Sequence, residues 1–377
     1  MRLLAVSRFG IEKITARELA ELGYRNSRIA DGQITIDGTM EDAARMNVFL
    51  RTAERVMIVL REFKAVSFEE LFQGIKAFEW ADILPVDAFI HVTAKSIRSK
   101  LFSIRDIQSV TKKAIIEVLK KRYRMDRLEE SGYRYRIEIG ILKDEVSVML
   151  DTSGEGLHKR GYRKLAGEAP MSETIAAAII QLSVWNREKT LVDPFCGLGT
   201  VPIEAALIGT KTAPGLNRDF RAAGYEAFDG RNAFIKAKEE AEYMMTPDEE
   251  LKIIGTDIDS EAISKARYHA REAGVEDKIH FQVMDVSEIS SKDRYGVIIA
   301  NPPYGERLLE ASEAALLYKK MRSSFDKFDT WSKYILSAYK GFEVIYGEKA
   351  AKRRKIYNGM IECQLYQYPG PKPPLSL

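Results

Sequence analysis

The chain has 377 residues, which is long for one ordinary domain, and its composition of 45% hydrophobic and 30% charged residues is that of a globular protein with an adequate core. No apolar stretch approaches the length of a membrane span, and the N-terminal segment lacks the apolar run of a signal peptide. The net charge of +3 is nearly neutral; two cysteines cannot form a disulfide framework, and four histidines show no metal-ligand spacing. We therefore expect a reducing, cytoplasmic location and no bound metal.

The first 155 residues alternate between strand and helix patterns. The apolar spacing predicts strands at 3–8, 55–63 and 89–96, helices at 11–22, 40–50, 68–78 and 104–122, and hairpins that turn at Asp31-Gly32 and Lys143-Asp144. This alternation indicates two packed α+β lobes, which we place at 1–60 and 61–155.

Positive charge is concentrated in one part of this half. Residues 95–136 contain 13 Lys or Arg and 5 Asp or Glu, a local excess of 13 − 5 = +8. Such a segment, with Lys112 and Lys113 in the helix at 104–122, could meet a phosphate backbone. The alternative is a solvated helix face.

A glycine-rich, basic connector follows at 151–170. We expect few packing residues to cross it, and we place a linker at 156–170. Its cations could also contact nucleic acid; they are Lys159, Arg160, Arg163 and Lys164.

The second half repeats a strand–helix pattern. Strands are expected near 190–193 and at 253–259, 279–285, 295–300 and 331–338, and helices at 171–185, 261–273 and 311–325. This order favours an α/β fold with a parallel, doubly wound sheet. The irregular segment at 212–230 is long enough to be a functional loop or a partner surface. The cationic run at 352–359 could cover a ligand or close the sheet edge.

The segment ANPPYGERL at 300–308 follows the buried strand at 295–300. Pro302 and Pro303 have no N–H group and a fixed φ, so this backbone is stiff and offers only carbonyl acceptors. Asn301 adds a side-chain carbonyl and Tyr304 adds a flat ring. Two acceptors beside a stacking face suit a planar base with an exocyclic amine. The alternative is a Pro-rich turn that only closes a strand, which would have the same sequence pattern.

The loop DPFCGLGT at 193–200 lies between a strand and a helix. Its glycines let the backbone approach a ligand at a helix N-terminus. Pro202 stands where a dinucleotide-binding loop needs its third glycine, and the loop lacks the Lys-Ser/Thr pair of a P-loop.

Polar residues also end the later strands. Asp257, Asp285 and Asn301 would meet Asp193 at the carboxyl edge of a parallel sheet. Singly, each Asp is more typical of a cap or turn. As a set they suit a nucleoside without phosphates, which fits S-adenosylmethionine better than a nicotinamide dinucleotide.

These motifs resemble the class I S-adenosylmethionine-dependent amino-methyltransferases. The matching segments are DPFCGLGT, GTDID, QVMD and NPPYGERL. The whole chain resembles the members that carry a ferredoxin-like lobe (1–60) and an RNA-binding THUMP domain (61–155) before a Rossmann-like methyltransferase domain (171–377). It is most similar to bacterial 23S ribosomal RNA guanine-N2 methyltransferases, through GLHKRGYR, APMSETIAAAI, TAPGLNRDF and IYNGMIECQLYQY. Leu198 departs from the family's more usual serine.

The resemblance implies a role for each matching residue. Methyl transfer would depend on Asn301 and the Pro302 carbonyl as acceptors for the target amine, with Pro303 in the motif and Tyr304 stacked on the base. The methionine part of the cofactor would lie on Asp193, Gly197 and Gly199, the ribose on Asp257 and the adenine on Asp285. The full cofactor set is Met171, Glu173, Thr174, Asp193, Cys196, Gly197, Gly199, Thr200, Asp257, Ile258, Asp285, Val286 and Asn301. Nothing beside Cys196 would activate its thiol, so it is expected to pack. RNA contacts are expected from Lys112, Lys113, Lys159, Arg160, Arg163 and Arg307.

The expected reaction is methylation of guanine N2 in 23S ribosomal RNA by a monomer or weak homodimer. Three alternatives stay open: a guanine in transfer RNA, an N6-adenine target, and a non-catalytic RNA-binding assembly factor.

Overall fold

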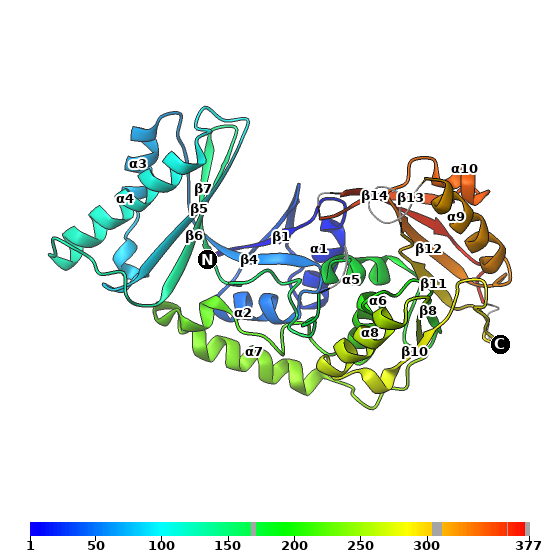
Figure 1. Ribbon diagram of the computed structural model, residues 1–377. Helices are drawn as coiled ribbons and strands as arrows, with labels where there is room; N and C mark the ends of the chain where they lie inside the picture. Colours follow the sequence, from blue (N-terminus) through cyan, green and yellow to red (C-terminus); the bar gives the residue numbers. More distant parts are fainter. Residues whose placement is uncertain (167–170, 304–310, 360, 374–377) are drawn as a thin grey trace.

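The computed structural model describes residues 1–166, 171–303, 311–359 and 361–373. Two seven-stranded sheets lie side by side along an elongated molecule, with helices packed against each (Figure 1). No helix in these described ranges is long and apolar enough to cross a bilayer.

The first sheet and its helices are formed by residues 2–151. In chain order the elements are β1 (Arg2–Ser7), α1 (Glu12–Glu21), β2 (Arg28–Ala30), β3 (Gln33–Asp37), α2 (Met40–Phe49), β4 (Ala53–Lys64), α3 (Phe68–Lys76), η1 (Trp80–Asp82), β5 (Phe89–Ile97), α4 (Ile104–Tyr123), β6 (Arg134–Leu142) and β7 (Glu145–Asp151). Helix ends follow local chemistry: Thr39 and Asp42 form a capping box at α2, and Ser67 accepts the first-turn N–H of Glu70 at α3.

The two expected α+β lobes are packed together through one shared sheet. The strand order is β2-β3-β1-β4-β7-β6-β5, and the 12-residue strand β4 pairs with β1 through its first half and with β7 along most of its length. Residues 60 and 61, where we placed a domain boundary, both lie inside β4. One hydrophobic core runs through both lobes, from Leu3 and Ile34 to Ile107 and Ile137. The domain limits remain predictions.

The second half contains α5 (Glu173–Leu182), β8 (Leu191–Asp193), α6 (Thr200–Gly209), η2 (Arg221–Gly224), η3 (Glu226–Phe228), α7 (Gly230–Met244), β9 (Ile253–Asp257), α8 (Ser260–Glu272), η4 (Glu276–Lys278), β10 (Ile279–Val283), β11 (Val297–Ala300), α9 (Ala311–Phe325), β12 (Ser332–Ser337), α10 (Phe342–Tyr346), β13 (Lys352–Asn358) and β14 (Ile361–Tyr368). The sheet order is β10-β9-β8-β11-β12-β14-β13.

This second sheet is mixed rather than wholly parallel. Strands β10, β9, β8, β11 and β12 run parallel, while β14 pairs antiparallel with β12 and with β13. The cationic run at 352–359 is largely β13, so it closes the sheet edge. Along β11, Val297 and Ile299 join the core under α5, α6 and α8, whereas Ile298 and Ala300 face the core under α9 and α10. This alternation buries the strand on both faces.

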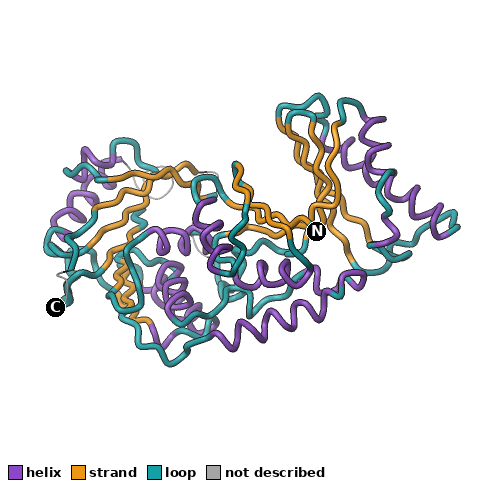
Figure 2. Tube along the Cα trace, turned by 180° about the vertical axis from the view of Figure 1, so that it is seen from behind, coloured by secondary structure: helices purple, strands orange, loops and turns teal. Residues whose placement is uncertain are grey.

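The insertion at 212–230, which we expected to be a functional loop or a partner surface, is partly buried and packs against the first sheet. The ring of Tyr225 stacks on Tyr135 of β6 at 4.6 Å between centroids, and both side chains are fully buried. Helix α7, which the sequence analysis did not predict, runs beside α2, below the first sheet in Figure 1 and again visible from behind (Figure 2). Arg45 of α2 binds both carboxylate oxygens of Glu240 in α7 at 2.7 and 2.8 Å.

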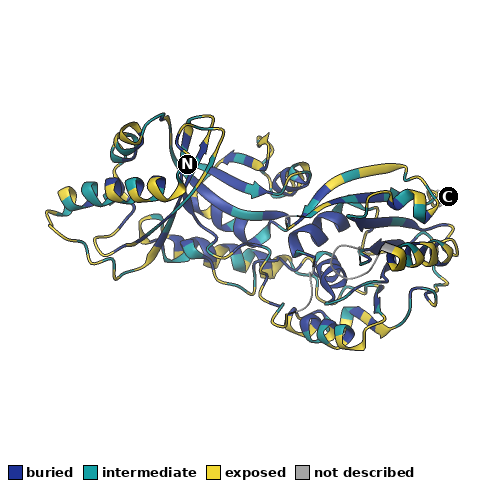
Figure 3. Ribbon diagram, turned by 45° about the horizontal axis from the view of Figure 1, so that its top comes forward, coloured by how far each residue is buried: buried dark blue, intermediate teal, exposed yellow. Residues whose placement is uncertain are grey.

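The connector after β7 is also held by packing, contrary to our expectation for 151–170. Leu157, Arg160 and Tyr162 are at most 4% exposed. The guanidinium of Arg218, from the insertion, donates to the carbonyls of four connector residues, which are Ser153, Glu155, Gly156 and Lys159. The connector therefore contacts both halves, because Arg160 bonds to Glu204 and to the Arg51 carbonyl; Figure 3 shows the burial of each described residue.

Candidate active site

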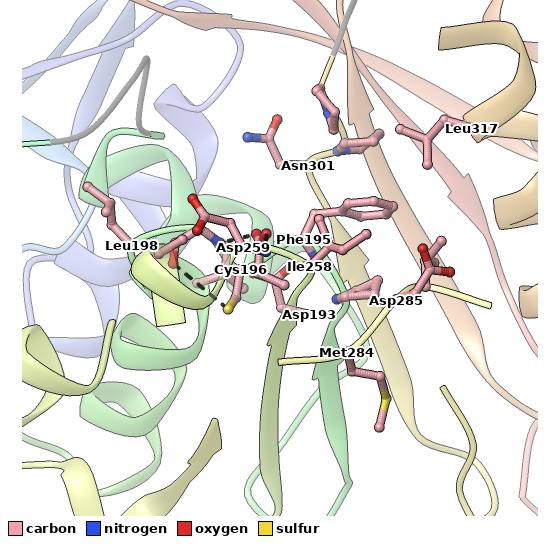
Figure 4. Close-up of a pocket in the computed structure, with 18 of the residues that line it drawn as sticks. Asp193, Phe195, Cys196, Leu198, Ile258, Asp259, Met284, Asp285, Asn301 and Leu317 are labelled. Atoms are coloured by element: carbon pink, nitrogen blue, oxygen red, sulfur yellow. Dashed lines mark hydrogen bonds between the residues drawn. The ribbon is translucent and has the colours of Figure 1, made fainter. Parts of the chain in front are cut away.

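Four polar residues stand where neighbouring strands of the second sheet end. Asp193 ends β8 and Asp257 ends β9, while Asp285 follows β10 and Asn301 follows β11. Because these strands are parallel and adjacent, their carboxyl ends meet at one edge. All four residues line one cavity of about 870 Å³, a volume within the range of small-molecule sites (Figure 4).

The loop after β8 is folded by hydrogen bonds to its flanking carboxylates. The Phe195 N–H donates to Oδ1 of Asp193 at 3.1 Å, and the Gly197 N–H donates to Oδ2 of Asp257 at 2.9 Å. Gly197 and Gly199 have φ of +50° and +82°, which L side chains rarely adopt. At Gly199 a Cβ would also lie 3.0 Å from a side chain of α8. The first glycine shapes the cavity floor, and the second packs the loop on α8.

Asp193 is almost wholly buried, at 2% exposure. Burial, together with the nearby charge of Asp257, raises the pKa of Asp193 to about 8, although the Phe195 N–H acts in the opposite direction. A cation bound beside this carboxyl would favour its ionised form.

The cavity as a whole is acidic. Among the described residues, the charged side chains in its wall are six acids and two lysines: Asp193, Asp257, Asp259, Glu261, Asp285 and Glu313, with Lys265 and Lys320. This balance favours a ligand that carries positive charge.

Asp285 is held in the ionised form by its partners. Its Oδ1 accepts from the N–H and Oγ of Ser287 at 2.8 and 2.5 Å, and its Oδ2 accepts from Nζ of Lys320 at 2.7 Å. Burial works against ionisation, but the bonds from Lys320 and Ser287 outweigh it and lower the pKa of Asp285 to about 2.

Asn301 lines the cavity and carries an unused acceptor. Its Oδ1 is buried and has no hydrogen-bond partner among the described residues. A buried acceptor without a donor costs about 1–3 kcal/mol, so this oxygen is suited to a ligand N–H. Pro302 and Pro303 continue the same wall. Tyr304 and Arg307 lie outside the described residues.

The structure brings most of the expected cofactor residues together. In addition to the four strand-end residues, the cavity wall includes Met171, Cys196, Gly197, Thr200, Ile258 and Val286. Burial raises the pKa of the Cys196 thiol well above its ordinary value, so the thiol stays neutral, in agreement with a packing role.

Glu173, Thr174 and Gly199 do not line the cavity. Glu173 forms an ion pair with Arg163, and Thr174 donates its hydroxyl to Oε1 of Glu54 in β4 at 2.6 Å. These residues tie the start of α5 to the connector and to the first sheet. A sequence motif marks them as near the site but does not show which way their side chains point.

Several cavity residues were missed by the sequence analysis. One group lies on α9 at the helical spacing i, i+3, i+4 and i+7, namely Glu313, Leu316, Leu317 and Lys320. The others lie near the strand ends, in α8 and on β14; they are Pro194, Phe195, Leu198, Val201, Asp259, Glu261, Ala262, Lys265, Met284 and Ile361. The helical spacing on α9 was the available signal, but periodicity alone does not say which face meets a ligand.

Two of the expected RNA-binding cations are engaged in contacts within the protein, Arg160 fully buried and Arg163 half-buried. Arg160 is 4% exposed, and its guanidinium bonds to Glu204 and to the carbonyls of Leu157 and Arg51, so it is not available to RNA. Arg163 donates to Glu173 and to the Met171 carbonyl, which supports the cavity wall from behind. A count of charges cannot distinguish a buried guanidinium from an exposed one.

The three other expected cations that the structure describes, Lys112, Lys113 and Lys159, are accessible. Lys112 pairs with Glu130, Lys113 lies over the ring of Phe72, and Lys159 pairs with Glu155 on the surface. Within the described ranges, no group of three or more His, Cys, Asp or Glu side chains is placed to hold a metal ion.

Comparison with known proteins matches three family models along the chain. They describe an RlmL ferredoxin-like domain at residues 2–57, a THUMP domain at 65–151 and an RMKL-like methyltransferase domain at 160–367. YpsC of Bacillus subtilis, a provisionally assigned RNA methyltransferase, is 43% identical over 97% of this chain and 95% of its own length. The ribosomal RNA large subunit methyltransferase K/L of Psychromonas ingrahamii is 32% identical over 95% of this chain, which spans 49% of that longer protein.

Solved structures of methyltransferase-like proteins resemble this chain over nearly its whole length. SMU.472, a provisionally assigned methyltransferase in complex with S-adenosylhomocysteine (SAH), has a TM-score of 0.93 and 41% identity, covering 99% of both chains. A Listeria monocytogenes protein, assigned by prediction as an N6-adenine-specific DNA methylase, has a TM-score of 0.92 and 44% identity, covering 98% of this chain and 96% of its own. The chain belongs to the family of methyltransferases that join a ferredoxin-like domain of the RlmL type and a THUMP domain to an RMKL-like methyltransferase domain.

Proposed function

We propose that the chain is an S-adenosyl-L-methionine-dependent methyltransferase that methylates the exocyclic amine of an RNA base. The observation that carries this proposal is the buried Oδ1 of Asn301, which has no partner in the described part of the chain; Asn301 lines the cavity together with Asp193, Asp257 and Asp285. The named activities of the relatives and the SAH bound to SMU.472 support the same reaction.

The cofactor fits the cavity in size, charge and donor set. S-adenosyl-L-methionine carries two positive groups, its ammonium and its sulfonium, and the wall is acidic. Asp193 and the Gly197 loop would hold the methionine part, Asp257 the ribose hydroxyls and Asp285 the adenine amine. When bound, the cofactor supplies a methyl group that its sulfonium charge already activates.

The protein's part in the reaction is positioning. Asn301 Oδ1 and the Pro302 carbonyl accept the two N–H groups of the target amine and hold its nitrogen lone pair toward the methyl group. Both acceptors also stabilise the positive charge that develops on that nitrogen. Because Pro302 and Pro303 have no N–H group, these two residues offer no backbone donor that would compete for the lone pair. Stacking of the base on Tyr304 remains a prediction.

A paired base cannot reach a cavity at the end of a sheet. The target is therefore a single-stranded or flipped-out nucleotide. Contacts with the RNA backbone are assigned to Lys112, Lys113 and Lys159, which are accessible. The cytoplasmic location expected from the sequence and a monomeric or weakly dimeric state remain predictions.

Guanine N2 of the large ribosomal RNA is the target we favour, because the Psychromonas relative is named for the large-subunit RNA. An N6-adenine target is the second candidate, since the Listeria protein's assignment names that atom. Two carbonyl acceptors would bind either amine equally well. A guanine in transfer RNA is the remaining catalytic alternative.

The test is mass spectrometry of nucleosides from RNA incubated with the protein and isotope-labelled cofactor, with ribosomal and transfer RNA separated first. Label in N2-methylguanosine of the large ribosomal RNA is the expected result. Label in N6-methyladenosine would show that adenine N6 is the target atom, and label in transfer RNA would show that transfer RNA is the substrate. No label in any RNA, with the cofactor bound, would overturn the proposal in favour of a non-catalytic binding factor.

A further inference from the structure

Helix α9 places a lysine directly on the carboxylate assigned to the adenine. Glu313, Leu316, Leu317 and Lys320 form the face of α9 that lines the cavity. Lys320 reaches across to the strand edge, where its Nζ donates to Oδ2 of Asp285 at 2.7 Å. Ser287 donates twice to the other oxygen. The carboxylate is thus held from two sides, by its own loop and by a helix about 35 residues further along the chain.

We infer that Lys320 is a positioning residue, which fixes Asp285 so that its Oδ2 accepts the 6-amino group of the cofactor's adenine. This inference depends on the proposed function. A carboxylate oxygen accepts two donors, so Oδ2 keeps one lone pair after it binds Lys320. Asp285 lines the cavity, so a ligand donor there can use this lone pair. A 6-amino purine can donate to it, whereas a 6-oxo purine would place a second acceptor there.

The charge of Lys320 also opposes the effect of burial on Asp285. Burial raises the pKa of this carboxyl, and the Lys320 bond is the largest of the effects that lower it. The other charged groups in the cavity wall are Asp193, Asp257, Asp259, Glu261, Lys265 and Glu313, and Lys327 donates to the Ser287 carbonyl at 3.1 Å. Without Lys320, burial would act with less opposition and the pKa of Asp285 would rise.

The experiment measures SAH affinity by calorimetry from pH 5 to pH 8 for the full-length protein and three variants. Lys320→Met removes the charge at similar length, Lys320→Arg keeps it, and Lys319→Met changes the exposed neighbour on α9 as a matched control. The same titrations use S-inosylhomocysteine, the 6-oxo analogue of SAH. Melting curves check that each variant is folded; Lys320 is 42% exposed, so its loss should not unfold α9.

For Lys320→Met we expect SAH to bind about 3–10-fold more weakly than to the wild type at pH 8, and the deficit to widen toward pH 5, because the pKa of Asp285 is higher without the Lys320 bond. Preference for SAH over the 6-oxo analogue should fall by at least about fivefold. Lys320→Arg should retain most of the SAH affinity and most of the preference for SAH over the 6-oxo analogue, and Lys319→Met should match the wild type in both.

A deficit that is the same at every pH, with unchanged preference between the two purines, would mean that Lys320 only supports the fold and would overturn the inference. Unchanged affinity would overturn it as well. Failure of the wild type to bind SAH at all would instead refute the cofactor assignment on which the inference depends.

Discussion

Asp193→Asn should stabilise the ligand-free protein and weaken cofactor binding at the same time. The wild-type carboxyl has a pKa of about 8 in the folded chain, against 3.8 for the ordinary group. Since the folded state binds this proton more tightly than the unfolded state, the free energy of unfolding is highest below pH 3.8 and falls as the pH rises toward 8. At pH 7 the loss is about 3 pH units at ~1.4 kcal/mol each, or about 4 kcal/mol.

Asparagine has the same shape and retains an oxygen for the Phe195 N–H, now 3.1 Å from Oδ1 of Asp193. Asparagine does not titrate, so the free energy of unfolding of the variant does not fall with pH through this group. Its new N–H groups would cost about 1–3 kcal/mol if one stays unpaired. That cost is the same at every pH. The most informative measurement is therefore how the difference in free energy of unfolding between variant and wild type changes from pH 5 to pH 7. It should shift by about 3 kcal/mol in favour of the variant.

Denaturant unfolding of the ligand-free proteins at both pH values measures this change. Calorimetry with SAH in buffers of different ionisation enthalpy should show close to one proton released on binding at pH 7 by the wild type and none by the variant, which binds at least tenfold more weakly. A stability difference that does not vary with pH, together with proton-free binding by the wild type, would refute the reasoning.

Three further predictions concern the rest of the molecule. Tyr225→Ala should lower the free energy of unfolding by about 3–5 kcal/mol, because it removes one ring of a buried aromatic stack. Tyr225→Phe should lower it by about 1 kcal/mol, because it removes only the hydroxyl that donates to the Asp151 carbonyl. Chemical denaturation compares the two variants, and equal losses would contradict the packing argument. Deletion of residues 1–155 should give an insoluble protein, because Phe220, Tyr225 and Phe234 belong to the core of the first sheet; a soluble fragment that binds SAH in gel filtration and calorimetry would show that this shared core is dispensable. Lys112→Gln with Lys113→Gln should weaken RNA binding and reduce the slope of log affinity against log salt by about 1–2 in filter binding, without a change in SAH affinity; an unchanged slope would remove α4 from the RNA interface.

Local pattern was sufficient for most of the second sheet. The buried run at 297–300, the strand-end carboxylates and the double proline each have a direct physical meaning, and the structure gathers Asp193, Asp257, Asp285 and Asn301 in one cavity. Four parallel strands leave little freedom for where their ends can meet. The antiparallel hairpin β13–β14 was harder to predict, because a cationic run does not reveal its pairing partner.

Features that depend on contacts between distant segments could not be predicted from local pattern. Arg160 reads as a surface cation in the sequence, yet it bonds to Glu204, 44 residues away, and to the carbonyl of Arg51. The segment at 212–230 has the sequence of an irregular loop, and only the stacking of Tyr225 on Tyr135 in the folded chain shows that it is packed. The contact between Lys320 and Asp285 is of the same kind.

The measurement that tests the central claim most directly is a single-turnover methyl transfer assay with labelled cofactor on deproteinised RNA, comparing the wild type with Asn301→Ala. If Asn301 orients the target amine, the variant should bind SAH within about threefold of the wild type while its transfer rate falls at least about 100-fold. Transfer by Asn301→Ala at close to the wild-type rate, with the same cofactor affinity, would contradict the claim that this acceptor positions the base.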